Sequence, residues 1–546
     1  MKKIPIGVDD FKKIRTRDYY YIDKTRFAEE IMKDGAEIKL FTRPRRFGKT
    51  INMSMLRYFF DIKNKEENRK LFDGLYIENT PLMEEQGKYP VIFISMKGIS
   101  CLSWEESLKE LRSKISELFD EYKDIKDSLT ERDLAKYKKI WYEEPDADYR
   151  GSLIFLTKIL NNYYNQPVIL LIDEYDAPLI AAYEHGYYYD AVNFFKNFYG
   201  SVLKTNPHLK MGVMTGIIRV AQAGIFSDLN NLKVNTILNE SYSDCFGLLE
   251  KEVEEALNYY GLEYNMAEVK NWYDGYRFGK KELYNPWSII NYLSSRKLGA
   301  YWINTSGNYL IKDILRYADG MLFDRLNILL SGGKIEESVT GRSSLGDVLN
   351  AHDVWELLLF SGYLTIDEVI DEEEDIYSIR IPNKEIRKFF RNSFIEVAFG
   401  SSALFRNLVM CLLENRIPEF ERTLQEILLK YMSFNDTSTI EKVYHNFILG
   451  LMIHLDGEYE IKSNLESGYG RYDMVLEPLN RSRRAFVLEF KTASSEKKLE
   501  SKAEEGLQQI EEKKYYLTLK EKGLTQITLL GMAFHKKLVR IRYKEI

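Results

Sequence analysis

The sequence predicts an α/β protein in three parts: a parallel-sheet domain, a mostly helical middle segment and a smaller α/β domain. Three observations support this prediction. A glycine–lysine–threonine loop lies between a strand and a helix at 41–56, an apolar strand ends in two carboxylates at 168–174, and two strands at 471–492 carry acidic and basic side chains. We expect the three parts to span residues 1–285, 286–435 and 436–546.

The composition is typical of an ordinary folded protein. Of the 546 residues, 45% are hydrophobic and 29% are charged, with a net charge of −6, which argues against a generally basic nucleic-acid coat. The longest apolar runs, such as PVILLI, are far shorter than the roughly 20 residues of a membrane span. No membrane partner is therefore expected. We expect no secretion signal, because the N-terminal residues include no apolar core segment. Cys101, Cys245 and Cys411 show no disulfide or metal spacing. A reducing cytoplasm is the expected location.

Residues 41–56 have the features of a phosphate-binding loop in an altered form. Gly48, Lys49 and Thr50 follow a short strand and open a helix, so that backbone N–H groups and the helix N-terminus would meet an anion. We expect Lys49 to reach the outer phosphates and Thr50 to bind Mg²⁺. Arg43 stands where such a loop usually has its first glycine. The residues expected to contact the nucleotide here are Arg43, Pro44, Arg45, Arg46, Phe47, Gly48, Lys49 and Thr50.

The apolar strand in NQPVILLIDEYDAPL ends in Asp173 and Glu174. A carboxylate at the tip of a buried strand can hold Mg²⁺, and a glutamate after it can polarise water. An acidic turn without such a role is the alternative, but the pairing with the loop favours a site. A third strand, in HLKMGVMTGIIRVA, ends at Thr215 and is followed by Arg219. These residues are placed to sense the γ-phosphate, or they form an ordinary strand exit with a surface arginine.

The middle segment, residues 286–435, is predicted to be mostly helical, without metal or nucleophile spacing. Within it, DVWELLLFSGYLTIDEV…YSIRIPNKEIRKFF predicts a helix, a turn at Gly362, two strands joined by the acidic loop Asp371 to Asp375, and a further helix. A helix followed by a two-stranded ribbon is the order of a winged helix. We favour a structural or relay role over DNA contact, because the acidic loop would repel phosphates.

The segment SNLESGYGRYDMVLEPLNRSRRAFVLEFKTA predicts two neighbouring strands with chemically active side chains. Asp473 lies in the first, and Glu489 and Lys491 lie on one face of the second because strand side chains alternate. Two carboxylates and the Phe490 carbonyl form an oxygen site suited to Mg²⁺ or Mn²⁺. A hairpin with surface charges is the alternative, but a buried strand is a costly place for unpaired charge. Glu466, just upstream, is a candidate further ligand.

The C-terminal part also differs in charge from the rest of the chain. From residue 436 onward there are 19 Lys and Arg against 17 Asp and Glu, whereas the remainder is net negative. This balance permits a surface that faces nucleic acid. The basic residues Arg481, Arg483 and Arg484 would hold a backbone phosphate or form a solvated turn.

The chain resembles the predicted AAA-ATPase-like proteins that carry a C-terminal PD-(D/E)XK nuclease domain. The matching segments, which cover nearly the whole chain, are KKIPIGVDDF, YYYIDKTRFAEEI, FTRPRRFGKT, LIDEYDAPL, MTGIIRVA, WYDGYRFG, YNPWSI and YWINTSGN. The resemblance implies an additional-strand (ASCE) P-loop ATPase domain in which RPRRFGKT, with its Arg43, is a Walker A variant and Asp173 and Glu174 form Walker B. It also implies that D…E-x-K is the nuclease site, with Gln509 and Tyr515 at the polar positions of the helix that follows.

Two short aromatic segments of the resemblance, WYDGYRFG around Asp274 and YNPW around Asn285, contain the residues of tight turns. We expect a structural role for them. The alternative is that they shape the nucleotide pocket.

The sequence therefore predicts a hydrolase with two active parts. One binds ATP and is expected to hydrolyse it; the other is a Mg²⁺- or Mn²⁺-dependent nuclease with Asp473, Glu489 and Lys491 as catalytic residues. ATP would gate the nuclease, DNA is favoured over RNA as its substrate, and a homo-oligomer is compatible with this scheme. The alternatives are a nucleotide-switched DNA- or protein-binding module with an inactive nuclease fold, and an RNA-directed nuclease.

Overall fold

The structure is a computed structural model of the 546-residue chain. It describes residues 1–218, 226, 230–302, 325, 326, 328–330, 332–341, 351–390, 402–431, 444, 448, 452, 455, 458–463, 466, 467, 470, 471 and 473–546. The chain divides into two compact units: unit 1 comprises Met1–Thr305 and Lys334–Ile386, and unit 2 comprises Ser306–Gly333 and Arg387–Ile546. Each unit has its own central sheet.

The main sheet of unit 1 is parallel, with the described strands in the order β2-β3-β4-β1-β5. The strands are β1 (Ile38–Thr42), β2 (Val91–Ser95), β3 (Val168–Asp173), β4 (Leu209–Gly216) and β5 (Leu232–Asn235). β1 and β3 are buried along their whole length, as expected for continuous apolar strands covered on both faces. Because the strands are parallel, the ends of β1, β3 and β4 meet at one edge of the sheet, where ligands of such folds bind.

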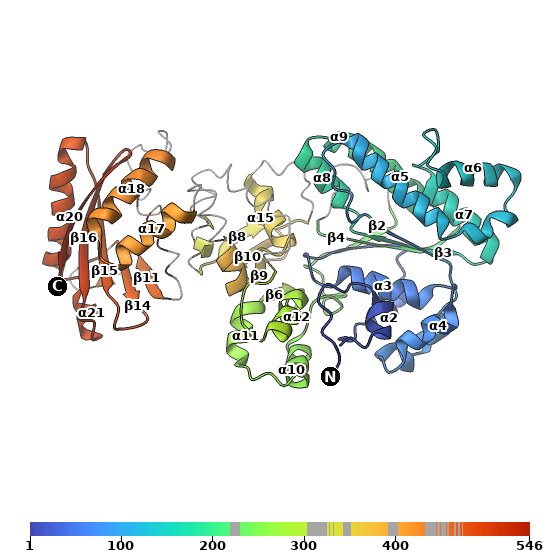
Figure 1. The fold of residues 1–546 in the computed structure, drawn as a ribbon, viewed down its shortest axis with the longest axis horizontal. Coiled ribbons are helices and arrows are strands. Elements are labelled where there is room, and N and C mark those ends of the chain that lie inside the picture. Colours follow the sequence, from blue (N-terminus) through green and yellow to red (C-terminus); the bar gives the residue numbers. More distant parts are fainter. Residues whose placement is uncertain are drawn as a thin grey trace. The chain divides into compact units, whose positions relative to one another are not determined.

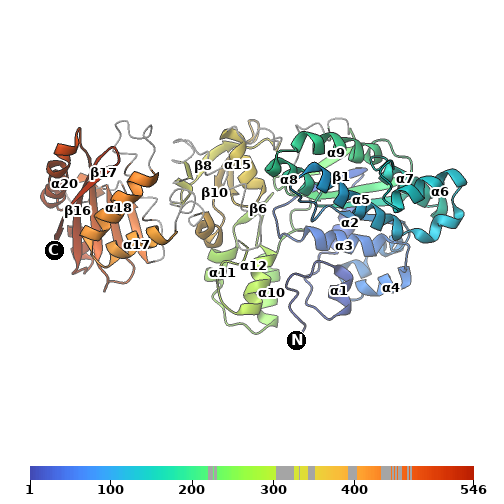
Figure 2. The same ribbon diagram turned by 45° about the horizontal axis from the view of Figure 1, so that its top comes forward.

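Helices cover both faces of this sheet, with α5, α7 and α9 on one face and α2 and α3 on the other (Figures 1 and 2). α5 and α6 begin after Ser103 and Thr130, whose hydroxyls accept N–H groups of the first turn. The helices of this part are α1 (Phe11–Thr16), α2 (Arg26–Lys33), α3 (Lys49–Phe60), α4 (Lys65–Arg69), α5 (Trp104–Asp120), α6 (Glu131–Trp141), α7 (Ser152–Tyr164), α8 (Ala177–His185) and α9 (Tyr188–Leu203).

After the main sheet, unit 1 continues into a small helical cluster. Its elements are α10 (Glu250–Tyr259), α11 (Met266–Tyr273), the hairpin of β6 (Tyr276–Phe278) and β7 (Lys281–Leu283), and α12 (Pro286–Ser295). Their shared core includes Val253, Leu257, Val269, Tyr273 and Ile289. α12 begins after Asn285, whose side chain accepts the N–H of Ser288 at 3.2 Å.

A second, smaller sheet of unit 1 contains the ribbon predicted in the middle segment. α15 (Ala351–Phe360) precedes β9 (Thr365–Asp371) and β10 (Ile376–Arg380), which pair antiparallel. Gly362, with a φ of +86°, forms the turn after α15. The predicted order of helix, strand and strand is confirmed. β8 (Ile335–Ser338) pairs with the other edge of β10, and the winged-helix assignment stays a prediction.

Unit 2 is built on a mixed sheet with the described strands in the order β11-β14-β15-β16-β17. β15 and β16 are parallel, and the other neighbours are antiparallel. α20 covers one face of the sheet and α17 and α18 the other (Figures 1 and 2). The strands are β11 (Tyr459–Ser463), β14 (Met474–Pro478), β15 (Ala485–Thr492), β16 (Ile527–His535) and β17 (Leu538–Glu545), with β12 (Glu466–Ser467) and β13 (Gly470–Arg471) as a separate hairpin; the helices are α17 (Ser402–Leu413), α18 (Ile417–Tyr431), α20 (Leu499–Lys513) and α21 (Leu517–Glu521).

The helices α17 and α18 belong to the same unit as this sheet. The Gln425 side chain of α18 donates to Lys537 O at 2.6 Å and accepts from Val539 N at 2.9 Å, and Glu421 pairs with Arg540 at 2.7 Å. α12 and the ribbon, in contrast, belong to unit 1. The compact units thus divide the chain at other positions than residues 285 and 435, and the three-part division by function stays a prediction.

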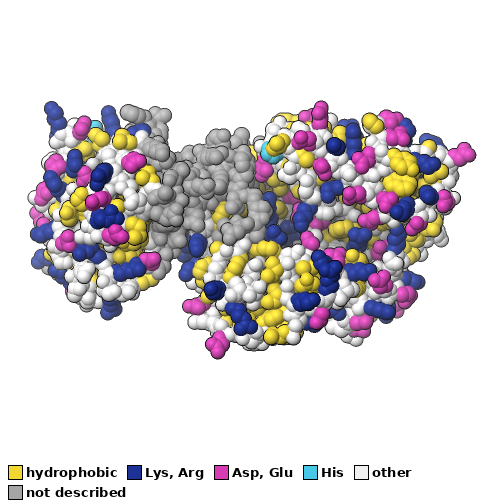
Figure 3. All heavy atoms as spheres, viewed as in Figure 1, with side chains coloured by type: hydrophobic (Ala, Val, Ile, Leu, Met, Phe, Trp, Pro, Cys, Tyr) yellow, Lys and Arg dark blue, Asp and Glu magenta, His cyan; other side chains and the backbone are white. Residues whose placement is uncertain are grey.

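None of the helices in the described part of the chain combines the length and the apolar character that a bilayer crossing requires. On the face seen in Figure 3, acidic and basic side chains are interspersed over the described surface.

Candidate nucleotide and metal sites

The candidate phosphate-binding loop runs from Arg43 to Gly48, between β1 and α3. Gly48 has a φ of +85° and directly precedes α3, and Arg46 has a φ of +67°. Left-handed residues in such a loop help to turn successive N–H groups toward one point, a geometry that binds anions. The predicted strand–loop–helix arrangement is present. Glycine adopts this backbone at little cost, whereas Arg46 needs surrounding contacts to hold it there.

Lys49 opens α3, and its ammonium is enclosed by the loop. Nζ donates to the carbonyls of Arg43 at 2.9 Å and Pro44 at 2.8 Å. Burial lowers the pKa of Lys49 to about 8, and the charge of Glu174 opposes this shift. The side chain is thus charged at neutral pH, and a bound phosphate would compete with two loop carbonyls for it.

Asp173, at the end of β3, lies between two hydroxyl groups. Its Oδ2 accepts from Thr50 Oγ1 at 2.9 Å, and its Oδ1 accepts from Thr215 Oγ1 of β4. The residue is fully buried, and burial raises the pKa of its carboxyl. The Thr50 hydroxyl and the Asp173 carboxylate are oxygen donors from two elements at hydrogen-bond distance. This donor set fits Mg²⁺ bound together with a nucleotide phosphate.

Glu174 follows Asp173 in a left-handed conformation, with a φ of +52°. Its N–H donates to Thr215 Oγ1 at 3.4 Å. Burial, with the charge of Asp173 as the second cause, raises the pKa of the Glu174 carboxyl. A strained backbone and a perturbed carboxyl beside a candidate metal ligand are features of a functional site. Arg219, expected to lie near this edge, falls outside the described residues.

Asp176 is a further buried carboxylate, and one that sequence reasoning missed. Its Oδ2 accepts the N–H groups of Ile217 at 2.7 Å and Ile218 at 3.0 Å, and burial raises its pKa. It therefore ties the start of α8 to the backbone that leaves β4. The spacing of three residues from Asp173 was the available signal, and an acidic turn explains it equally well.

Arg43 points into the core of unit 1 and is fully buried. Its Nη1 donates to the carbonyls of Thr42 at 2.9 Å and Asn235 at 2.8 Å, and its guanidinium carbon lies 5.2 Å from the ring centre of Phe246 and 5.3 Å from that of Phe278. Burial lowers its pKa to about 10. The expected contact of Arg43 with phosphate is not favoured by this placement, which fits a structural role.

Two further loop residues, Arg46 and Phe47, pack against the segments YNPW and WYDGYRFG. The Arg46 guanidinium carbon lies 4.1 Å from the ring centre of Trp287. The Phe47 ring lies 4.9 Å from Tyr276 and 5.1 Å from Phe278, between ring centres. These aromatic segments lie more than 200 residues away in sequence, which supports the alternative that they shape the nucleotide pocket.

The second site lies at the centre of the unit 2 sheet. Asp473 directly precedes β14, and its Oδ2 accepts the N–H of Phe490 in β15 at 2.7 Å. Glu489 and Lys491 lie on the same face of β15, with Nζ 2.9 Å from Glu489 Oε1. The structure thus brings together the three residues predicted as the D…E-x-K group. The sequence predicts Asp473 inside the first strand, but the structure places it one residue before β14 begins at Met474.

One carboxylate oxygen of Glu489 lacks a hydrogen-bond partner among the described residues. The residue is 3% exposed, and its Oε2 is buried without a hydrogen-bond partner. Burial raises the pKa of Glu489 to about 7, with the charge of Asp473 as the second cause. A buried carboxylate oxygen without a partner is costly in a folded protein. A divalent ion between Glu489 and Asp473 would satisfy it, so the residues present fit Mg²⁺ or Mn²⁺.

α20 supports this site from one face of the sheet. Gln509 Nε2 donates to Glu489 Oε1 and lies 3.3 Å from Tyr515 Oη. The helix can approach because Gly506 and Gly531 face each other: a Cβ on Gly506 would lie 3.3 Å from the Cα of Gly531. Gln509 is therefore a positioning residue for Glu489, as its match to the polar positions of the resembled family implied.

Glu466 has no described side chain, although its backbone pairs with Arg471 in the β12–β13 hairpin. Its role as a further metal ligand stays a prediction.

The basic turn before β15 is engaged with acidic residues of the same unit. Arg483 forms an ion pair with Glu458, and Arg484 pairs with Glu545 at 2.8 Å. The structure favours the solvated turn over a phosphate-binding role for these two arginines.

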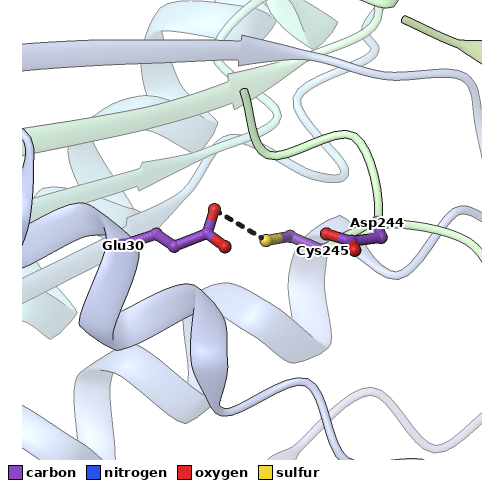
Figure 4. Close-up of side chains that lie close together, drawn as sticks. All are labelled: Glu30, Asp244 and Cys245. Carbon is purple, nitrogen blue, oxygen red and sulfur yellow. Dashed lines mark hydrogen bonds between the residues drawn. The ribbon is translucent and has the colours of Figure 1, made fainter. Parts of the chain in front are cut away.

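Glu30, Asp244 and Cys245 form a third group of potential ligands, drawn in Figure 4. Cys245 Sγ donates to Glu30 Oε2 at 3.5 Å, and its carbonyl accepts from Asn52 Nδ2 of α3 at 2.8 Å. Burial raises the pKa of the thiol, which keeps its proton on sulfur. Since metals bind the thiolate, the group acts here as a tie between α2, α3 and the loop at 244–245.

Comparison with known proteins identifies two domains in the chain. Residues 5–226 match the family model of the predicted AAA-ATPase, and residues 439–544 match the PD-(D/E)XK nuclease superfamily. The protein is also 26% identical, over 98% of its length and 97% of the relative's, to the "Uncharacterized protein in vnfD 5'region" of Azotobacter chroococcum mcd 1. The two domains implied by the sequence resemblance are thereby confirmed.

The burial of Lys49 predicts that ATP binding weakens in mildly alkaline solution. Binding needs the ammonium form, and with a pKa of about 8 in the empty site only about a tenth of the molecules carry it at pH 9. We expect the Kd for ATP to rise about tenfold between pH 7.5 and pH 9. The Lys49→Arg variant stays charged throughout and is the control. An equal rise in both proteins would show that Lys49 is not the group responsible.

The burial of Arg43 predicts that Arg43→Ala destabilises the fold and does not weaken ATP binding more than adenosine binding. Arg43→Ala leaves two buried carbonyls unpaired and opens a cavity, so we expect the free energy of unfolding to fall by about 3 kcal/mol. The exposed Arg46 is the matched control, and Arg46→Ala should change stability by less than about 1 kcal/mol. Thermal unfolding measures both. Should Arg43→Ala instead weaken ATP more than adenosine in a stable protein, Arg43 would be a phosphate contact.

Proposed function

We propose that this protein is a metal-dependent nuclease controlled by an ATP-binding domain that hydrolyses ATP. The observation that carries the proposal is the buried Glu489, with one oxygen unpartnered among the described residues, beside Lys491 and Asp473. The match of residues 439–544 to a nuclease superfamily supports phosphodiester cleavage as the reaction of this group.

In the nuclease site, Asp473 and Glu489 would hold the divalent ion, which when bound activates water and stabilises charge on the scissile phosphate. Asp473 is fixed by the Phe490 N–H, and Glu489 by Gln509 and Lys491. The carboxylates are therefore held in place before any substrate arrives.

Lys491 would orient water and neutralise the charge that develops on the phosphate. In the structure its ammonium pairs with Glu489 Oε1. This pairing keeps a partly buried cation satisfied in the absence of phosphate and leaves it within reach of a group bound at Glu489.

In the nucleotide site, Lys49 would bind the outer phosphates, Thr50 and Asp173 would hold Mg²⁺, and Glu174 would polarise the attacking water. The support is the hydrogen bond between Thr50 and Asp173 and the match of residues 5–226 to a predicted AAA-ATPase. ATP binding would then gate or assemble the nuclease, in a homo-oligomer or within one chain.

DNA is the proposed substrate, and RNA is the alternative, since the site needs only a phosphodiester. The other alternative is a nucleotide-switched binding module without cleavage. A cytoplasmic setting is part of the proposal and agrees with the free thiols of Cys101, Cys245 and Cys411. Incubation with plasmid, linear DNA and RNA, with Mg²⁺ or Mn²⁺ and with or without ATP, distinguishes these cases.

The nuclease proposal predicts loss of cleavage in three single variants. Asp473→Ala and Glu489→Gln should each lower the cleavage rate at least about 100-fold because they remove metal ligands, and Lys491→Ala should do the same while metal still binds. Glu496→Gln, at an exposed carboxylate of the same unit, is the matched control and should cleave normally. Wild-type protein that leaves every substrate intact with ATP and Mn²⁺ present would contradict the proposal.

The ATPase proposal predicts that binding and turnover separate. Mg²⁺-ATP should raise the Tm of the wild type. Lys49→Ala should bind ATP at least about tenfold more weakly, because a charge-assisted contact is lost. Glu174→Gln should bind normally but turn over about 100-fold more slowly, since it keeps the shape and removes the base. Calorimetry and phosphate release measure these effects, with Glu131→Gln on α6 as control. Equal turnover in Glu174→Gln and wild type would remove Glu174 from the catalytic role.

A further inference from the structure

The chain leaves unit 1 at two positions in the sequence, and described residues that precede them contact one another or the phosphate-binding loop. Unit 1 consists of Met1–Thr305 and Lys334–Ile386, so the chain passes to unit 2 after residue 305 and after residue 386. Tyr301 and Trp302 precede the first crossing, and Glu385 precedes the second. All three contact one another or the loop.

Trp302 holds the loop through its indole. Its Nε1 donates to the carbonyl of Arg45 at 3.1 Å, and its ring lies against that of Tyr363 with 5.0 Å between centres. The neighbouring Gly362 approaches Pro44 so closely that a Cβ would lie 2.7 Å from the proline Cβ. Gly362, in the turn after α15, therefore packs against Pro44, and Trp302 contacts Arg45.

Trp287 holds the next loop residue and connects it to the same segment. Its ring lies under the Arg46 guanidinium, 4.1 Å from the guanidinium carbon, and its Nε1 donates to the carbonyl of Tyr301 at 3.1 Å. The two indoles thus connect Arg45 and Arg46 to Tyr301 and Trp302. A cation over an indole ring is a favourable contact, of about 0.5 to 1 kcal/mol at an exposed residue such as Arg46.

The buried Glu385 side chain holds the backbone of Tyr301 and Trp302. The residue is fully buried, and its Oε1 accepts the backbone N–H groups of Tyr301 and Trp302, the latter at 2.6 Å. Its Oε2 accepts from Ser288 Oγ of α12 at 2.7 Å. A buried carboxylate with three donors is well satisfied, so it holds Tyr301 and Trp302 in one position. Burial raises its pKa.

We propose that Trp287, Trp302 and Glu385 form a clamp that holds the phosphate-binding loop in its nucleotide-accepting shape, and that nucleotide binding in turn strengthens the contacts of Tyr301, Trp302 and Glu385. The clamp replaces what glycine supplies in other loops of this kind. Arg46 adopts a left-handed φ of +67°, which costs a non-glycine residue about 1 kcal/mol, and the Trp287 ring holds it there.

The effect of ATP binding on the clamp follows from thermodynamic linkage. If the clamp strengthens ATP binding, ATP must strengthen the clamp by the same factor. The residues affected would be Tyr301 and Trp302, a few positions before the first crossing, and Glu385, next to the second. The inference rests on the proposed ATP binding, and it adds the route by which that site acts on the chain segments that lead to unit 2.

The test uses the full chain and two conservative variants. Trp302→Phe keeps an aromatic ring and removes the indole N–H, and Glu385→Gln keeps the shape and removes the charge. Trp104→Phe is the matched control, because the Trp104 ring packs on Phe194 of α9. ATP and adenosine affinities are measured for each protein. Hydrogen exchange of peptides covering 296–302 and 380–390 is followed in the wild type with ATP, with adenosine and without ligand.

We expect Trp302→Phe and Glu385→Gln to bind ATP about 5- to 10-fold more weakly, a typical coupling factor, with less than a twofold change for adenosine, and Trp104→Phe to bind both normally. ATP, but not adenosine, should slow exchange in both wild-type peptides. If ATP raises the wild-type Tm but leaves both peptides unchanged, the inference is overturned and the proposed ATP binding stands. If ATP does not raise the Tm, both are overturned. The exchange comparison decides the matter even if a variant fails to fold.

Discussion

The conformation of the phosphate-binding loop depends on side chains that lie outside it. A loop rich in glycine can turn its N–H groups toward an anion without help, because glycine adopts left-handed backbone readily. Here the loop contains Pro44 and three arginines in place of glycines, and Arg46 still adopts a left-handed backbone with a φ of +67°. The indole of Trp287 and the rings packed on Phe47 hold the turn. The conformation of this loop is therefore inseparable from the folding of the helical cluster that follows the main sheet.

In the second site, the burial of the Glu489 carboxylate determines which groups must surround it. Glu489 lies in a strand that packs on both faces, where an ionised carboxyl is expensive to bury. Lys491 and Gln509 satisfy one of its oxygens, and the other has no partner among the described residues. Its pKa, raised to about 7, reflects this incomplete compensation. The proposed metal ion would pair this oxygen, and Gln509 of α20 holds the Glu489 side chain in position.

The sequence predicted the elements that carry the sites, because their signals are local. The strand, loop and helix around Gly48 and Lys49 follow from residue types that are adjacent in the chain. Glu489 and Lys491 share a face because strand side chains alternate every two residues, and the domains implied by the resemblance match known families. Asp176 was missed because its partners, the N–H groups after β4, lie about 40 residues away. No local pattern distinguishes it from a solvated turn residue.

By itself, the sequence determined the order and type of the elements and the chemistry of the groups on them, since backbone propensity and side-chain periodicity act over a few residues. Tertiary structure decided where the long side chains point. Arg43 and Arg46 are neighbours in one loop, yet the first is sealed between Phe246 and Phe278 and the second lies over Trp287. A guanidinium on a flexible stem takes its direction from the surfaces packed around it. Those surfaces come from residues more than 190 positions away, which only the folded chain brings to the loop.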